Sequence, residues 1–252
     1  MKIPRPTTPT DRRPYRIKGP ARILIVSDVH VPFHDPGAIE ASIDFAQSQG
    51  EISHVLVNGD LLDAYHLSTF EKDPKVRRLS EEIDQAIQIL QVFAQELPGV
   101  KMIFKLGNHE ARFDRYLRTN APALADLPEI SLEDIFRKRI QEVDVVEEWR
   151  NIVAGRLLIN HGHEVGRGSG GQHPAKWLVA KTGTSAICGH FHRTDSWTTR
   201  DALGRPLQGW TTGALCQLSP DYLPRNQWNH GAAFVDVRPG GGFHVTNKIF
   251  HA

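Results

Sequence analysis

The sequence has little of what would mark several broad classes of protein. Its 252 residues include two Cys and two Met, and the net charge is only +1. Two cysteines, Cys188 and Cys216, are too few for a disulfide framework, so we expect reduced core residues, with one bridge as the alternative. No apolar run approaches the roughly 18 residues of a membrane span, and the N-terminus lacks the apolar core of a signal peptide. The expectation is therefore a cytoplasmic protein with no membrane partner.

The low net charge also argues against a nucleic-acid surface over the whole chain, although it leaves room for a local basic groove. Charge is concentrated in residues 1–20, which hold five Pro and six Lys or Arg against one Asp. This composition predicts a basic, extended arm that is disordered or lies on the surface. A nucleic-acid or partner-binding arm is the alternative. We expect one domain over residues 21–252.

The first half of that domain alternates strands and helices. Apolar runs predict strands at 22–28, 54–60 and 100–110. A helix is expected at 36–49 after Asp35-Pro36, and a longer one should begin at Asp73-Pro74 and end at 97–99. Strands joined by helices form right-handed units with parallel pairing, so the sequence predicts an α/β fold.

The second half follows a different pattern. Residues 111–150 are polar, and the expectation is a helical excursion from the sheet with Ser131 as a helix cap. Beyond 150, short strand-like segments are joined mostly by Gly-containing turns, which favours antiparallel pairing. The segment 238–244 is the clearest hairpin turn.

Five segments end in residue types that bind metals. Because the carboxyl ends of parallel strands meet at one edge of a sheet, we expect these segments to converge there. Glycine recurs beside them, where it permits sharp turns and leaves room for metal and phosphate. The segments are Ser27-Asp28-Val29-His30, Gly59-Asp60, Gly107-Asn108-His109-Glu110, Asn160-His161-Gly162-His163 and Gly189-His190-Phe191-His192.

The mixture of carboxylate, amide and imidazole ligands is typical of sites for borderline divalent ions such as Mn, Fe or Zn, and we expect Mn first. It is typical neither of Ca sites, whose ligands are mostly oxygen, nor of thiolate sites. Seven ligands are too many for one such ion, but with one bridging carboxylate they can hold two. Two divalent ions are the arrangement used for phosphate ester hydrolysis.

At these residues the chain resembles the calcineurin-like metallophosphoesterases, whose blocks D-x-H, G-D, G-N-H-D/E, H-G and G-H-x-H occur here in that order. The resemblance implies a four-layer α/β/β/α sandwich of two mixed sheets. It also implies that one metal is held by Asp28, His30 and His192, the other by Asn108, His161 and His190, with Asp60 bridging. Chemistry alone does not separate His161 from His163, and the motif favours His161.

The same resemblance assigns His109 as general acid or as a hydrogen-bond donor to the phosphate, and Asp63 as the residue that orients it. Arg112 lies within reach of a phosphate near His109, with an exposed helix position as the alternative. His163 is a second substrate-side candidate, with a structural role as the alternative. The segment 163–177, with Arg167, His173, Lys176 and four Gly, predicts a mobile loop at the mouth of the site.

We therefore expect a binuclear phosphoesterase that hydrolyses phosphodiesters or phosphomonoesters through a metal-bridging hydroxide, with a small or nucleotide-like substrate. The protein Ser/Thr phosphatases of this family carry the motifs R-G-N-H-E and G-D-x-x-D-R-G. Here Leu106 stands in place of the Arg of the first motif, and Ala64-Tyr65 stands in place of the Arg-Gly that ends the second, so that branch is disfavoured. A nuclease that grips nucleic acid through the arm and residues 112–118 is the alternative. A non-catalytic scaffold has less support because no ligand is missing.

Overall fold

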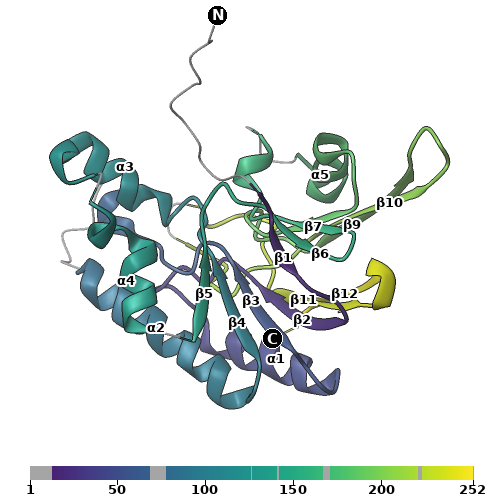
Figure 1. Ribbon diagram of the computed structural model, residues 1–252, viewed down its shortest axis with the longest axis horizontal. Coiled ribbons are helices and arrows are strands. Elements are labelled where there is room, and N and C mark those ends of the chain that lie inside the picture. The colour runs from purple at the N-terminus through teal and green to yellow at the C-terminus, as the bar shows by residue number, and fades with distance from the viewer. Residues whose placement is uncertain are drawn as a thin grey trace, which may run out of the picture.

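The structure is a computed structural model that describes residues 13–68, 78–125, 127–140, 142–166, 171–220 and 223–251. In these ranges, twelve strands form two six-stranded mixed sheets (Figure 1). The first sheet has the order β12 (Phe243–Ile249), β11 (Gly231–Val237), β2 (Ala21–Val26), β3 (His54–Asn58), β4 (Lys101–Lys105), β5 (Val143–Val146). The second has the order β1 (Tyr15–Ile17), β6 (Ile152–Ala154), β7 (Leu157–Ile159), β8 (Ala186–Cys188), β10 (Pro206–Thr211), β9 (Asp195–Arg200).

Helices cover the outer faces of the two sheets. Figure 1 shows α1, α2 and α4 beside the first sheet and α5 beside the second. None of the helices in the described ranges combines the length and hydropathy of a transmembrane segment. The helices are α1 (Pro36–Ser48), α2 (Leu79–Glu96), α3 (Ala111–Asn120), α4 (Leu132–Arg139) and α5 (Pro174–Thr182), with 3-10 turns η1 (Tyr65–Leu67), η2 (Pro122–Leu124), η3 (Pro128–Ile130), η4 (His163–Val165) and η5 (Pro239–Gly241).

Strand β2 shows how the layers are held together. Ile23 and Ile25 enter the apolar core between the two sheets, whereas Leu24 and Val26 enter the core beneath α1 and α2. Alternate residues of a strand point to opposite faces, and burial of both faces explains the continuous apolar run in the sequence. The predicted fold class, a four-layer α/β/β/α sandwich of two mixed sheets, is confirmed.

The predicted helix caps agree with the structure where they fall in described residues. The Asp35 carboxylate accepts the Ala38 N–H at 2.9 Å, and the Ser131 hydroxyl accepts the Asp134 N–H at 3.1 Å. The predicted start of the long helix at Asp73-Pro74 lies outside the described residues, and α2 begins at Leu79.

Two predictions about the edges of the sheets were wrong. Residues 15–17 of the expected arm form β1, which pairs in parallel with β6. The helical excursion ends with α4, because 143–146 is strand β5 at the edge of the first sheet. These strands have three and four residues, which is too short for an apolar period to be visible in sequence.

The antiparallel expectation for the second half holds only in part. Strands β6–β7, β9–β10 and β11–β12 are antiparallel, but β7–β8 and β8–β10 are parallel. Helix α5 explains the first of these parallel pairs, because it crosses between β7 and β8, and parallel neighbours require a crossover. The sequence interpretation had placed the start of α5 within a mobile loop.

Candidate metal centre

The five metal-ligand segments meet at one edge of the two sheets. Asp28 and His30 follow β2, Asp60 follows β3, Asn108 and His109 follow β4, His161 follows β7, and His190 and His192 follow β8. The backbones of these loops are joined directly, since the His30 N–H donates to the Asp60 carbonyl at 2.9 Å. The His190 N–H also donates to Asp28 Oδ2 at 2.9 Å. Residues far apart in sequence therefore surround one small volume.

Most of the candidate ligands adopt a backbone conformation that L-residues rarely use. Asp28, His30, Asp60, His190 and His192 have φ of 57°, 50°, 53°, 69° and 53°, and Ala64 is the sixth such non-glycine residue in the described ranges. Conformations of this kind cost free energy and persist where the surroundings enforce them, commonly at functional sites. The strain is concentrated in the residues that the sequence had singled out.

The neighbouring glycines provide space for ligand side chains. A Cβ on Gly59, whose φ is +89°, would lie 2.3 Å from His161 Nδ1, and a Cβ on Gly107 would lie 2.3 Å from Asp60 Oδ1. The sequence interpretation had assigned this space to metal and phosphate. The structure corrects it, because the side chains that approach these glycines are the candidate ligands themselves.

One half of the site is formed by Asp28, His30 and His192. His192 Nε2 lies 3.2 Å from Asp28 Oδ1, and His30 Nε2 lies 3.1 Å from His192 Nε2. His30 Nδ1 contacts the Asp63 carboxylate at 3.1 Å, which turns Nε2 toward the centre. A carboxylate behind the outer nitrogen of a histidine is the usual outer contact of a metal-binding imidazole.

The other half contains Asn108, His161 and His190. His161 Nδ1 lies 2.7 Å from the Asn58 carbonyl and donates to it, so Nε2 is the nitrogen that faces the site. Ligand atoms of His161, His190 and Asp60 lie within 4.8 Å of one another. Among the described residues, the buried Asn108 Oδ1 has no hydrogen-bond partner. A buried polar atom without a partner is costly, and a metal would satisfy this one.

Asp60 lies between the two halves. Its Oδ2 is 3.1 Å from His161 Nε2 and 3.9 Å from His30 Nε2. Burial favours a neutral carboxyl, but His161 and His109 outweigh burial and hold the pKa of Asp60 well below its usual value. Burial likewise opposes charge on His161, yet Asp60 and Asp28 raise its pKa to about 10. The site thus favours positive charge beside its carboxylates, which fits bound cations.

His109, Asp63 and Arg112 form a connected group beside this centre. His109 Nδ1 lies 2.9 Å from the Asp63 carbonyl and 3.2 Å from Asp63 Oδ1, and its Nε2 lies 3.8 Å from Asp60 Oδ2. Arg112 donates to the Asp63 carbonyl at 2.7 Å and approaches His109 Nε2 at 3.0 Å. The Arg112 side chain is only 14% exposed, so the alternative of an exposed helix position does not hold.

His163 is placed near the centre but turned toward carboxylates. Its Nε2 lies 2.9 Å from Glu148 Oε1 and its Nδ1 lies 3.2 Å from Glu164 Oε2. The hydrogen bond from Nε2 to Glu148 favours the structural alternative over substrate binding. The predicted mobile loop is only partly described, since Arg167, Gly168 and Gly170 lie outside the described residues. Lys176 lies on α5, with its ammonium over the Trp197 ring.

Two buried carboxylates at this edge were not assigned from the sequence. Glu110 accepts the backbone N–H groups of Asp60, Leu62 and Gly107 at 2.7–3.0 Å, which fixes the loop that carries Asp60. Burial and the nearby Asp60 raise the pKa of Glu110 to about 7. The glutamate of the G-N-H-E block could have been singled out from its place in the motif, although not its contacts.

Glu164 has the same function for the His161 segment. It accepts the N–H groups of His161 and Gly162, both at 2.8 Å, and it lies 3.3 Å from the fully buried Lys105 ammonium. Burial opposes its charge, but Lys105 outweighs burial and lowers the pKa of Glu164 to about 2. No sequence signal pointed to this pair, because Lys105 lies inside an apolar strand.

With this geometry in place, the chain can be compared with known proteins. A family model described as calcineurin-like phosphoesterase matches residues 21–207, which include all five metal-ligand segments. The chain belongs to the calcineurin-like phosphoesterase family. Its residues provide candidate metal-binding groups at the expected edge, among them Asp60, His161 and His190 together; a second group joins His30 and Asp60 to His109, which was not expected to be a ligand.

Curated relatives and one solved structure are also similar to this calcineurin-like chain. The Gene 54 proteins of Mycobacterium phages L5 and D29 are each 29% identical to it, over 181 and 185 residues respectively. Both alignments cover 68% of this chain and 69% of the relative. A single mutant of Vps29 from Entamoeba histolytica matches with a TM-score of 0.42 and 13% identity, covering 91% of this chain and 99% of that one.

Proposed function

We propose that this protein is a phosphoesterase that uses two divalent ions, with Mn, Fe or Zn as the candidates. The proposal rests above all on the buried Asn108 Oδ1, which lacks a hydrogen-bond partner among the described residues, and on the cluster of Asp60, His161 and His190 beside it. Asp28, His30 and His192 would hold one ion, Asn108, His161 and His190 the other, and Asp60 both. When bound, such ions supply positive charge to a phosphate and acidify a water molecule.

His109 is the proposed proton donor to the leaving oxygen. Its Nδ1 is occupied by Asp63, so Nε2 is the atom that can deliver a proton. Burial disfavours the imidazolium, but Asp60 and Asp63 outweigh burial and raise the pKa of His109 above its usual value. A raised pKa keeps a larger fraction of His109 protonated, as a general acid requires.

Arg112 is the proposed phosphate-binding residue. The guanidinium lies 3.0 Å from His109 Nε2, and a protonated Nε2 cannot accept its hydrogen bond. A phosphate oxygen is a stronger partner for the planar fork of an arginine. Arg112 would therefore hold the substrate phosphate while His109 acts on the leaving group.

A shallow depression beside His192 supports a small or nucleotide-like substrate. Its lining includes Trp228, Phe191, Arg193 and Arg225. The Trp228 ring lies 4.1 Å from the His192 ring, centroid to centroid, so the depression borders the proposed metals. Aromatic faces and arginines together can bind a ring and a second phosphate.

The nuclease alternative has weaker support. In the arginine-rich segment 112–118, Arg112 faces the site and Arg118 lies 3.9 Å from Asp114, which reduces the charge offered to a nucleic acid. A salt titration separates the two functions. Binding to a nucleic-acid backbone weakens steeply with salt, whereas hydrolysis of a small diester at the metals should change little.

The test of the proposed function is a substrate screen on metal-free protein reconstituted with Mn, Zn or Fe. The panel contains bis-p-nitrophenyl phosphate, p-nitrophenyl phosphate, cyclic nucleotides, and labelled DNA and RNA. We expect hydrolysis of at least one small ester that disappears with chelator and returns with metal. Full activity in the metal-free protein, or none on any ester with both ions bound, would contradict the proposal.

A further inference from the structure

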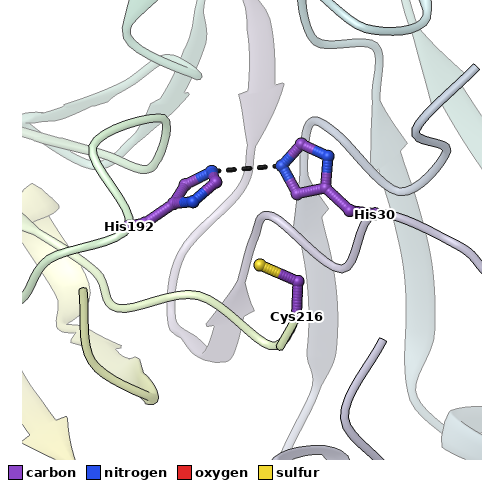
Figure 2. A group of neighbouring side chains, drawn as sticks. All are labelled: His30, His192 and Cys216. Atoms are coloured by element: carbon purple, nitrogen blue, oxygen red, sulfur yellow. Dashed lines mark hydrogen bonds between the residues drawn. The ribbon is translucent and has the colours of Figure 1, made fainter. Parts of the chain in front are cut away.

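Cys216 lies beside the half of the site formed by Asp28, His30 and His192. Figure 2 shows His30, His192 and Cys216 converging from three separate segments. One donor atom from each of the three lies within 4.8 Å of the others, and they are 5%, 8% and 3% exposed. The sequence analysis had expected Cys216 to be a reduced core residue, with a disulfide as the alternative, and both cysteines are free.

The backbone holds this cysteine firmly against the loop that carries Asp28 and His30. The Leu215 N–H donates to the Asp28 carbonyl at 3.1 Å, and the Leu215 carbonyl accepts from the Asp35 N–H at 2.8 Å. Cys216 itself forms an antiparallel bridge with His34. The thiol is therefore fixed relative to His30 by main-chain contacts on both sides.

The surrounding donor atoms indicate that a cation belongs at this position. His30 Nε2 and His192 Nε2 face each other at 3.1 Å, where a single proton or one cation is needed between the two lone pairs. These two nitrogens therefore do not satisfy each other unless a proton or a cation lies between them.

We propose that Cys216 supplies a thiolate ligand to the divalent ion held by Asp28, His30 and His192. The thiol would lose its proton to solvent as the sulfur–metal bond forms. A sulfur ligand favours Zn, Fe, Co and Cd over Mn. The two halves of the site would then prefer different metals, with the softer ion beside Cys216. This inference rests on the proposed two-metal function.

Cobalt absorption tests this ligand without relying on activity. Metal-free full-length protein is titrated with Co(II), and the thiolate-to-cobalt charge-transfer band is recorded in the near ultraviolet. We expect the band in wild type and its loss in both Cys216→Ser and Cys216→Ala. Cys188→Ala is the matched control, because Cys188 is also free and buried but belongs to no such cluster in the described residues. It should retain the band.

Competition between Cd and Mn gives a second, independent measurement. Loss of one sulfur ligand should weaken Cd affinity about tenfold or more and leave Mn affinity nearly unchanged. Wild type that binds two cobalt ions without the band, or a band that survives in both Cys216 variants, would overturn this inference and leave the proposed function intact. Protein that binds no cobalt would contradict both.

Discussion

The two halves of the proposed metal centre are held in place by different physical means. In the first half, Asp28, His30 and His192 all have left-handed backbone conformations. Hydrogen bonds between loops enforce them, since the Asp28 carbonyl accepts from Leu215 and the His192 carbonyl accepts from Asn229. Backbone geometry therefore positions these side chains.

In the second half, buried charged groups position the His161 segment. His190 shares the left-handed conformation, but Asn108 and His161 are not among the left-handed residues of the described chain. The His161 segment is instead fixed by Glu164, whose carboxylate is paired with the buried Lys105 ammonium. Changes in loop conformation should therefore damage the first half more, and changes in buried charge should damage the second half more.

Asp60→Ala should have the largest effect because Asp60 faces both halves. We expect both ions to be lost and activity to disappear on every substrate. Loss of an outer contact alone commonly costs about 10–100-fold, and a shared ligand must cost more. The measurement is metal content and turnover, with Asp44→Ala on the exposed face of α1 as control. A variant that still holds two ions tightly would show that Asp60 does not bridge the halves.

His109→Ala tests the residue that lies beside Asp60 without being a proposed ligand. We expect it to keep its metals and its fold and to lose about 10²–10⁴-fold in kcat on an alkyl or nucleoside diester. On a p-nitrophenyl ester the loss should be much smaller, since that leaving group scarcely needs a proton. An equal loss on both substrates would remove the general-acid role and leave His109 as a hydrogen-bond donor that binds the phosphate.

Lys105→Met tests the buried charge of the second half. Removing Lys105 leaves Glu164 as an uncompensated buried carboxylate, and we expect the free energy of unfolding to fall by about 3–5 kcal/mol. Lys101→Met is the matched control on the same strand, because the Lys101 side chain is 53% exposed and lies 2.8 Å from Asp144. Its loss should cost at most about 1 kcal/mol. The free energy of unfolding is measured by urea denaturation. If the two variants lost similar amounts of it, the Lys105–Glu164 pair would not be what stabilises the second half.

Of the three variants at the site itself, Asp63→Asn should have the smallest effect on activity, about tenfold. Asp63 Oδ1 contacts both His30 Nδ1 and His109 Nδ1, so the variant should combine a weaker first-half metal with part of the leaving-group bias of His109→Ala. Metal affinity and kcat on both ester types measure the two components. A pure leaving-group bias with unchanged metal binding would mean that Asp63 supports His109 alone.

The sequence predicted the parts of this molecule that depend on local pattern. Continuous apolar runs gave β2, β3 and β4, and Asp35 and Ser131 marked helix starts. The convergence of Asp28, Asp60 and Asn108 follows from parallel topology alone, since all three come directly after parallel strands. Local pattern therefore predicted an α/β fold and the edge that carries the site, whereas the four-layer sandwich was expected only from the family resemblance.

Features that depend on long-range contacts could not be predicted. Strand β1 has three residues and forms only because β6 is beside it. The Lys105–Glu164 pair joins residues on β4 and η4, and Cys216 reaches His192 only through the main-chain contacts of 214–217 with 28–35. Such pairs have no fixed spacing along the chain, so no sequence pattern predicts them.

The metal content of the purified protein tests the central claim most directly. Metal-free protein would be reconstituted separately with Mn, Zn and Fe(II) under anaerobic conditions, freed of excess metal, and examined by elemental analysis alongside turnover. The account predicts two ions per chain, with activity rising as they bind and falling to background with chelator. Protein that binds no divalent ion at this edge, or that hydrolyses esters fully without one, would contradict it.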